Sequence, residues 1–255
     1  MKGEIIGNFD VAQVTLYVFY IFFIGLIFYL RREDRREGYP LFSEPSNKLK
    51  GEDFLLLPTA KTFKLANGST VQAPNGQWDQ RTPNGTKIAP WPGAPLVPNG
   101  DPMLAAVGPG SFAEREDKPE MTLEGALKIV PLRAASGYAC DMRDGNPAGY
   151  QVIGADKAVA GTITDIWVDR SEALFRYLEM SVGAGGRKAL IPMNFAKIDK
   201  GRRQVHIHAL MANQFANIPA LANPDSVTKL EEEKVCAYFG AGTLYAHPSR
   251  TEPLL

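Results

Sequence analysis

The chain has 255 residues, with 28 lysines and arginines against 28 aspartates and glutamates. Its length and its 45% share of hydrophobic residues suit one or two folded domains, and the balanced charge argues against nucleic-acid binding, which normally needs a basic domain. The two cysteines, Cys140 and Cys236, are too few for a disulfide scaffold or a multi-cysteine zinc site.

Residues 11–30 form an uncharged stretch, VAQVTLYVFYIFFIGLIFYL, in which Gln13 and Thr15 are the clearly polar residues. A helix of this length spans about 30 Å, the thickness of the hydrocarbon core of a bilayer. A cleavable signal peptide would have a basic leader and a shorter apolar region, whereas here the arginines follow the apolar stretch. The sequence therefore predicts a retained transmembrane helix, capped by Asn8 or Asp10.

The charges around this helix predict its orientation. Four arginines follow it, namely Arg31, Arg32, Arg35 and Arg36, and Lys2 is the one base that precedes it. Positive charge is enriched on the cytoplasmic side of membrane helices, so we expect residues 1–10 in the periplasm and the remainder in the cytoplasm. The four arginines and Tyr39 should then lie at the membrane interface, where they can contact lipid or a partner.

Residues 31–120 are expected to form a membrane-surface segment that is rich in proline and glycine. The 36 residues from 74 to 109 contain 8 prolines and 5 glycines, which excludes long helices. Apolar residues such as Trp78, Trp91 and Met103 are interspersed and predict an extended strap held against another surface. A flexible linker is the alternative interpretation.

Residues 121–255 have the pattern of a mainly β domain. Short segments rich in β-branched and aromatic residues are separated by turn residues, at 150–153, 158–168, 174–182, 188–193 and 204–210. They predict a small antiparallel barrel. Residues 225–241 have the charge and apolar spacing of a C-terminal helix.

Motifs of the common hydrolases, metalloproteases, dithiol oxidoreductases and nucleotidases do not occur in the sequence. His206 and His208 share one face of a predicted strand, but two ligands make a weak metal site. Asp169, Glu172 and Arg176 belong to the densest group of titratable residues. Such a group could have coupled proton affinities if it is partly buried, although surface ion pairs are the simpler interpretation.

Six short strings occur in an order that points to a known family. They are residues 7–10 (GNFD), 35–41 (RREGYPL), 58–63 (PTAKTF), 107–109 (VGP), 164–169 (TDIWVD) and 230–236 (LEEEKVC). With the anchor helix between the first two strings, the chain resembles the H subunit of the purple-bacterial photosynthetic reaction centre over nearly its whole length.

The resemblance implies that residues 121–255 form a PRC-barrel domain and that the chain is a non-catalytic subunit. It would cap the cytoplasmic face of the L and M subunits in the bacterial inner (intracytoplasmic) membrane. Membrane lipids, a cytochrome subunit and a light-harvesting antenna are further candidate neighbours. In this family the L and M subunits hold bacteriochlorophyll, bacteriopheophytin, quinones and non-haem iron, so this chain is expected to bind no cofactor or metal itself.

The resemblance also implies that the cap shields the quinone sites and lets protons reach the secondary quinone. Family residues beside the proton uptake route match Asp169, Glu172 and Arg176. Some members carry a pair of surface histidines where this chain has Glu124 and Ala126. Glu124 is therefore a candidate surface proton acceptor, and inhibition by a metal is not expected at that place.

Two other classes of protein fit the sequence without the resemblance. One is a membrane-tethered barrel that docks an unrelated cytoplasmic partner, and the other is a membrane-anchored enzyme. The three hypotheses predict different results when the native protein is purified in mild detergent. A reaction-centre subunit should co-purify with two pigmented apolar partners, and a tethered barrel with a colourless complex. An anchored enzyme should show turnover as the isolated chain.

Overall fold

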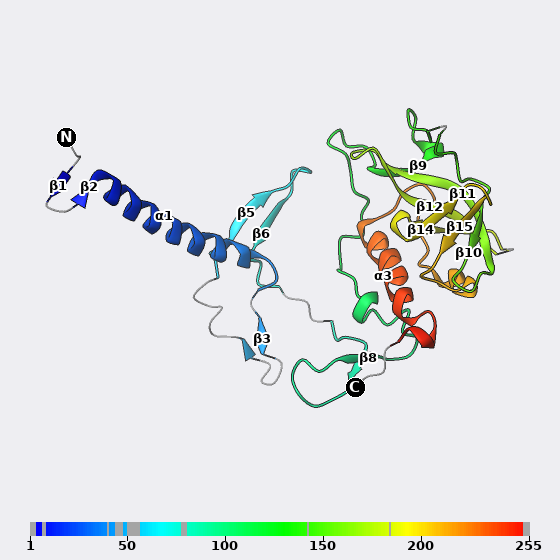
Figure 1. Ribbon diagram of the computed structural model, residues 1–255, viewed down its shortest axis with the longest axis horizontal. Helices are drawn as coiled ribbons and strands as arrows, with labels where there is room; N and C mark the ends of the chain where they lie inside the picture. The colour runs from blue at the N-terminus through cyan, green and yellow to red at the C-terminus, as the bar shows by residue number, and fades with distance from the viewer. Residues whose placement is uncertain are drawn as a thin grey trace. The chain divides into compact units, whose positions relative to one another are not determined.

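The computed structural model describes residues 4–6, 9–39, 41–43, 48–49, 57–77, 81–141, 143–183 and 185–251 (Figure 1). The chain divides into two compact units, residues 1–82 with 90–93 and residues 83–89 with 94–255. The sequence predicts a different division of the chain, after residues 10, 30 and 120, according to where each part is expected to lie relative to the membrane. That division stays a prediction.

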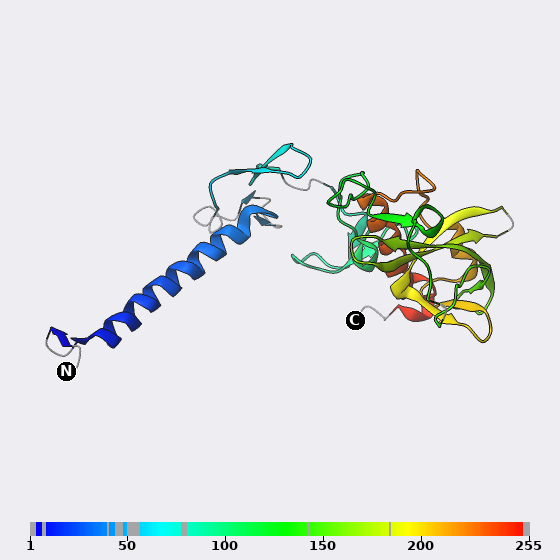
Figure 2. The ribbon, with the colours of Figure 1, turned by 90° about the horizontal axis from the view of Figure 1, so that it is seen from above.

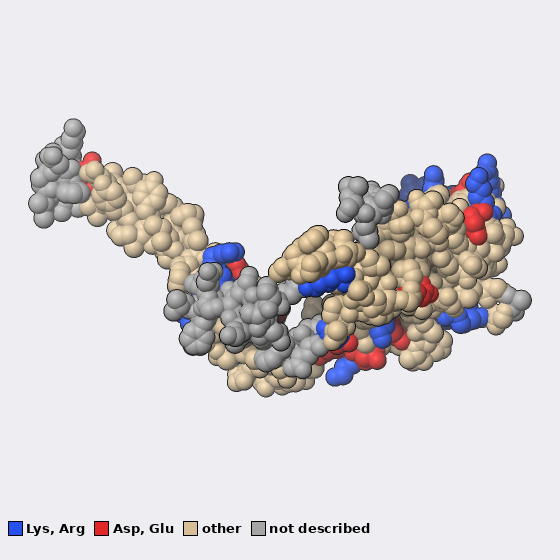
Figure 3. All heavy atoms as spheres, turned by 90° about the horizontal axis from the view of Figure 1, so that it is seen from below, with Lys and Arg blue, Asp and Glu red and all other residues tan. Residues whose placement is uncertain are grey.

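The first unit is dominated by the apolar helix α1 (Val11–Glu33), which continues into the 3₁₀ turn η1 (Asp34–Arg36). Asp10 caps the helix, as predicted, because its Oδ1 accepts a hydrogen bond from Gln13 N at 2.8 Å. Asn8, the other predicted cap, lies outside the described residues. None of the residues of α1 is buried, and Figure 3 shows most of its length without a lysine, arginine, aspartate or glutamate. By length and composition, Val11–Arg36 can cross a membrane.

Short antiparallel pairs make up the strands of this unit. They are β1 (Glu4–Ile6) with β2 (Phe9–Asp10), β3 (Phe42–Ser43) with β4 (Lys48–Leu49), and β5 (Lys61–Lys64) with β6 (Thr70–Ala73). In the β5–β6 hairpin, Ala66 and Asn67 form the turn, and the following Gly68 has a φ of 82°, which glycine adopts without a steric cost.

The second unit is built on one curled sheet of seven strands (Figure 2). The strands are β9 (Ile129–Pro131), β10 (Gln151–Ile153), β11 (Val159–Asp169), β12 (Leu174–Val182), β13 (Arg187–Pro192), β14 (Ala196–Asp199) and β15 (Gln204–Ile207). Their order is β13-β12-β11-β10-β15-β14, and β9 also pairs with β11. A separate hairpin, β7 (Gly85–Lys87) with β8 (Leu96–Pro98), lies in the proline-rich segment.

The predicted fold class is confirmed, with two refinements of the sheet. The prediction was an antiparallel sheet, whereas β10 and β15 pair in parallel. The short strands β9 and β14 were not predicted. β11 is long enough to pair with β10 near its start and with β9 near its end, and two register shifts against β12 accompany this change of partner.

The C-terminal helix α3 (Lys229–Tyr245) packs against the sheet, as Figures 1 and 2 both show. It begins four residues later than predicted, because Thr228 forms a capping box with Glu231. Phe239 of α3 is fully buried and contacts the rings of Phe195 and Phe215 at centroid distances of 5.5 and 6.5 Å. Met103 joins the same core, so the end of the predicted strap is held against the domain.

Candidate functional site

Asp169 is a fully buried carboxylate at the end of β11. Its Oδ1 accepts hydrogen bonds from the backbone N–H groups of Ser171 at 3.0 Å and Glu172 at 3.1 Å, which fixes the turn into β12. Its Oδ2 accepts no hydrogen bond from any residue that the structure describes. This oxygen lies 3.7 Å from Lys128 Nζ and 3.8 Å from Arg176 Nε. Asp169 therefore keeps an open acceptor position between two cations.

Lys128 connects Asp169 to the surface of the domain. Its Nζ lies 3.3 Å from Glu120 Oε2, and its backbone N–H donates to the carbonyl of Glu120 at 2.8 Å. Burial lowers the pKa of Lys128, but the hydrogen bond to Glu120 and the charge of Asp169 outweigh burial and raise it above its ordinary value. Lys128 is therefore charged at neutral pH, and Glu120, Lys128, Asp169 and Arg176 form a line of alternating charge.

The four residues predicted for proton transfer do not all lie in this line. Asp169 and Arg176 form an ion pair, and Glu172 is exposed in the turn that Asp169 caps. Glu124 is exposed at the tip of a tight turn closed by the hydrogen bond from Gly125 N to the carbonyl of Thr122. A hydrogen bond from the side chain of Thr122 holds the pKa of Glu124 below its ordinary value.

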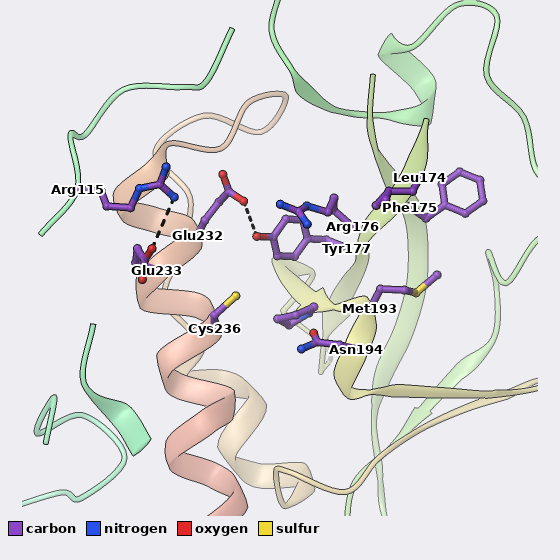
Figure 4. A pocket seen from close by; sticks show the side chains of 11 residues that line it. Arg115, Leu174, Phe175, Arg176, Tyr177, Met193, Asn194, Glu232, Glu233 and Cys236 are labelled. Atoms are coloured by element: carbon purple, nitrogen blue, oxygen red, sulfur yellow. Dashed lines mark hydrogen bonds and ion pairs between the residues drawn. The ribbon is translucent and has the colours of Figure 1, made fainter. Parts of the chain in front are cut away.

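Arg176 also lines a pocket of ≈ 450 Å³ between the sheet and α3 (Figure 4). The other lining residues are Arg115, Leu174, Phe175, Tyr177, Pro192, Met193, Asn194, Glu232, Glu233 and Cys236. At one wall, the hydroxyl of Tyr177 donates a hydrogen bond of 2.7 Å to Glu232 Oε2, as Figure 4 shows. At the rim, Arg115 Nη1 lies 3.6 Å from Glu233 Oε1.

Glu232 is the acid of this pocket that sequence analysis missed. Burial raises the pKa of Glu232, although the hydrogen bond from Tyr177 and the charge of Arg176 act in the opposite direction. Burial also raises the pKa of Tyr177, so its hydroxyl stays protonated and remains a donor. Arg176 thus stands between two buried carboxylates, Asp169 on β11 and Glu232 on α3.

A signal for Glu232 does exist in the sequence. Val235 and Phe239 follow it by three and seven positions, which places all three on one face of a helix. Since Val235 and Phe239 are core residues, Glu232 had to face the domain interior. Its neighbour Glu231 instead completes the cap, where its Oε2 accepts a hydrogen bond from Thr228 N at 2.8 Å.

The residues predicted for the membrane interface lie at the end of α1. Arg31 is exposed, Arg32 is partly buried, and Arg35 stacks on the ring of Tyr39 with Cζ 5.2 Å from the centroid. Arg36 is largely buried, because its guanidinium donates to Glu33 and to the carbonyl oxygens of Thr59 and Ala73.

No cluster of three histidine, cysteine, aspartate or glutamate side chains that could hold a metal occurs in the described parts of the chain. His206 pairs across the sheet with Lys197 on the neighbouring strand β14, and it is only partly buried.

One helix that could cross a membrane, followed by a curled sheet that a helix covers, is the architecture of a barrel domain tethered to a membrane. Residues 141–212 match the family model of the PRC-barrel domain. Residues 3–134 match the model described as photosynthetic reaction centre, H-chain N-terminal region. The chain belongs to the family of photosynthetic reaction centre H chains, which confirms the resemblance found in the sequence.

Membership of this family carries several consequences. The chain is a subunit of a photosynthetic reaction centre, located in a photosynthetic membrane and associated with L and M subunits. The cofactors of such a complex are held by other subunits.

Proposed function

We propose that this H chain caps the cytoplasmic face of the L and M subunits, stabilises their quinone sites and helps to conduct protons to the secondary quinone. In this role the chain carries out no reaction itself. The bacteriochlorophylls, bacteriopheophytins, quinones and non-haem iron belong to L and M, and light-driven electron transfer takes place there.

The observation that carries the proton-conduction proposal is that Oδ2 of the buried Asp169 accepts no hydrogen bond from the described residues. A buried carboxylate oxygen without a donor normally costs free energy, so its persistence suggests a water molecule or a partner group in that position. Lys128 and Arg176 lie 3.7 and 3.8 Å from this oxygen, and Glu172, in the same turn, is exposed to the solvent. Glu124 is exposed and lies four residues from both Glu120 and Lys128 in the sequence. It is the proposed surface acceptor in place of a histidine pair.

The orientation is part of the same proposal. The arginines at the end of α1 favour the cytoplasmic side, which puts residues 1–10 in the periplasm and the sheet domain in the cytoplasm. Residues 31–120 would run along the membrane surface, and residues 121–255 would form the cap. Arg31, Arg32, Arg35, Arg36 and Tyr39 would lie at this interface, where they could contact lipid headgroups or partner subunits.

The test is flash spectroscopy on the complex that carries Asp169→Asn together with Glu172→Gln. The second electron transfer to the secondary quinone, which needs a proton, should become slower, and primary charge separation should keep its rate. Asp144→Asn is the matched control, because this carboxylate is 87% exposed and lies outside the acid–base line. Second-electron kinetics equal to those of the control would refute a role for Asp169 and Glu172 in proton conduction.

A further inference from the structure

The β5–β6 hairpin has one apolar face and one polar face. Its strands pair Phe63 with Val71, and side chains alternate between the two faces of a strand. Phe63, Leu65 and Val71 therefore share one face, with Lys61 and Ala73 at its base. The opposite face carries Thr62, Lys64, Thr70 and Gln72.

The apolar face is open. Phe63, Leu65 and Val71 are 43%, 40% and 45% exposed. A two-stranded hairpin is at best marginally stable in water, because it has no second layer to cover its apolar side chains. Arg36 covers part of this face, with Cζ 5.9 Å from the centroid of the Phe63 ring, and the rest of the face needs another cover.

The hairpin is fixed to the last turn of α1. Arg36 Nη1 donates to the carbonyl oxygens of Thr59 at 3.0 Å and Ala73 at 2.8 Å, which lie at the base of the two strands. The same guanidinium is held by Glu33, and Lys61 Nζ lies 3.1 Å from Glu33 Oε2. Figure 1 shows β5 and β6 beside this end of α1. The distance of the hairpin from the membrane is therefore set by the helix.

A pocket of ≈ 490 Å³ lies between the apolar face and the end of the helix. Its polar side is formed by Glu33, Asp34, Arg36 and Glu37, and its apolar side by Phe63, Leu65, Val71 and Ala73. The uncharged part of α1 ends at Leu30, so the pocket begins about one helical turn beyond the hydrocarbon core. That depth corresponds to the headgroup layer.

We propose that the apolar face of β5–β6 is a lipid-binding surface, with Phe63, Leu65 and Val71 inserted at the boundary between headgroups and acyl chains. Two observations favour lipid over a protein partner. The hairpin is attached to the end of α1, so its apolar face lies near the depth at which this helix leaves the hydrocarbon core. Arg31 and Arg32, in the last turn of α1, supply positive charge at a similar depth, which suits lipid phosphates. The opposite face, with Lys64, points to water. This inference rests on the membrane helix and the family, and it is independent of proton conduction.

The test uses nitroxide labels on the assembled complex in vesicles of phosphatidylcholine and phosphatidylglycerol. Phe63→Cys and Val71→Cys place a label on the apolar face, and Thr62→Cys and Gln72→Cys are matched controls on the polar face. All four are made in a chain with Cys140→Ser and Cys236→Ser, and the signal of the equally treated parent complex is subtracted. The measurement is the accessibility of each label to oxygen, which dissolves in the bilayer, and to a water-soluble nickel chelate.

Labels at positions 63 and 71 should be more accessible to oxygen than to nickel, and the order should be reversed at positions 62 and 72. If labels at 63 and 71 are immobile and shielded from both reagents, a protein partner covers the face and the proposal is wrong. Preferential access of nickel to both positions would mean a water-exposed face, which also overturns it. Equal behaviour at all four positions contradicts it too, since the two faces must lie in different surroundings.

Discussion

Replacing Glu179 by alanine should destabilise the sheet domain strongly. Glu179 lies on β12, is 2% exposed, and accepts hydrogen bonds from four groups. These are Arg133 Nη1 at 2.9 Å, Thr164 Oγ1 at 2.8 Å, Trp167 Nε1 at 3.1 Å and Lys188 Nζ, whose ion pair measures 2.9 Å. The carboxylate thus joins β11, β12 and β13 to the segment that follows β9.

The expected cost follows from what each donor can do once the carboxylate is gone. Arg133 and Lys188 are partly exposed and can return to water, so each lost ion pair costs at most about 1 kcal/mol. Trp167 is fully buried, so its unpaired N–H costs about 1 to 3 kcal/mol. With the cavity left by the missing side chain, the free energy of unfolding should fall by about 3 to 5 kcal/mol.

The pH dependence of this effect has a definite sign. Burial raises the pKa of Glu179, but hydrogen bonds from Lys188 and Arg133 outweigh burial and lower it below the ordinary value of 4.5. A carboxyl with a lowered pKa stabilises the folded state above its ordinary pKa, and this contribution is lost as the pH falls through the lowered value. The difference between the wild type and Glu179→Gln should therefore shrink in acid.

The assay is urea unfolding of the full chain in mild detergent, followed by tryptophan emission. Asp144→Asn is the control for a lost surface charge. Trp167→Phe removes the donor that Glu179→Ala leaves unpaired, so the double variant should lose less stability than the sum of the two single variants. A loss below about 1 kcal/mol for Glu179→Ala, or strict additivity in the double variant, would refute the argument from the buried N–H group.

Two further predictions concern Arg36 and Glu232. Arg36→Ala should release the β5–β6 hairpin from α1, because its two hydrogen bonds to the carbonyl oxygens of Thr59 and Ala73 are lost at once. Trypsin should then cleave after Lys64 faster than in the control Arg31→Ala, and equal rates would contradict the attachment. Since burial raises the pKa of Glu232, its contribution to stability should decline as the pH rises from the ordinary value of 4.5 through the raised pKa. Glu232→Gln should flatten the fall of the melting temperature with pH over that range, and an unchanged slope would argue against a buried acid.

Local patterns in the sequence predict several elements of this fold. The uncharged stretch before Arg31 predicts α1, because the length of this one segment can be compared directly with the thickness of the bilayer. Alternating β-branched residues separated by turns predict β10, β11, β12, β13 and β15, with ends within a few residues. The parallel pairing of β10 with β15 could not be predicted, because more than fifty residues separate Gln151 from its partner Gln204. Nothing local distinguishes one open strand edge from another.

The candidate site divides in the same way. Asp169, Glu172 and Arg176 are close in sequence, so a turn between two strands brings them together and the pattern alone predicts their proximity. Lys128 and Glu232 reach the site from residues 41 before and 63 after Asp169, and only the packing of β9 and α3 places them there. Arg36 is similar, since its acceptors at Thr59 and Ala73 belong to a hairpin formed later in the chain.

Arg176 lies next to groups that come from distant parts of the sequence. Its charge is permanent, it remains partly exposed, and it borders both the open oxygen of Asp169 and the pocket that contains Glu232. At Glu232 the charge of Arg176 lowers the pKa and burial raises it, and burial prevails. Arg176 therefore connects the two carboxylates by its position, through an ion pair with Asp169 on one side and its charge acting on Glu232 on the other.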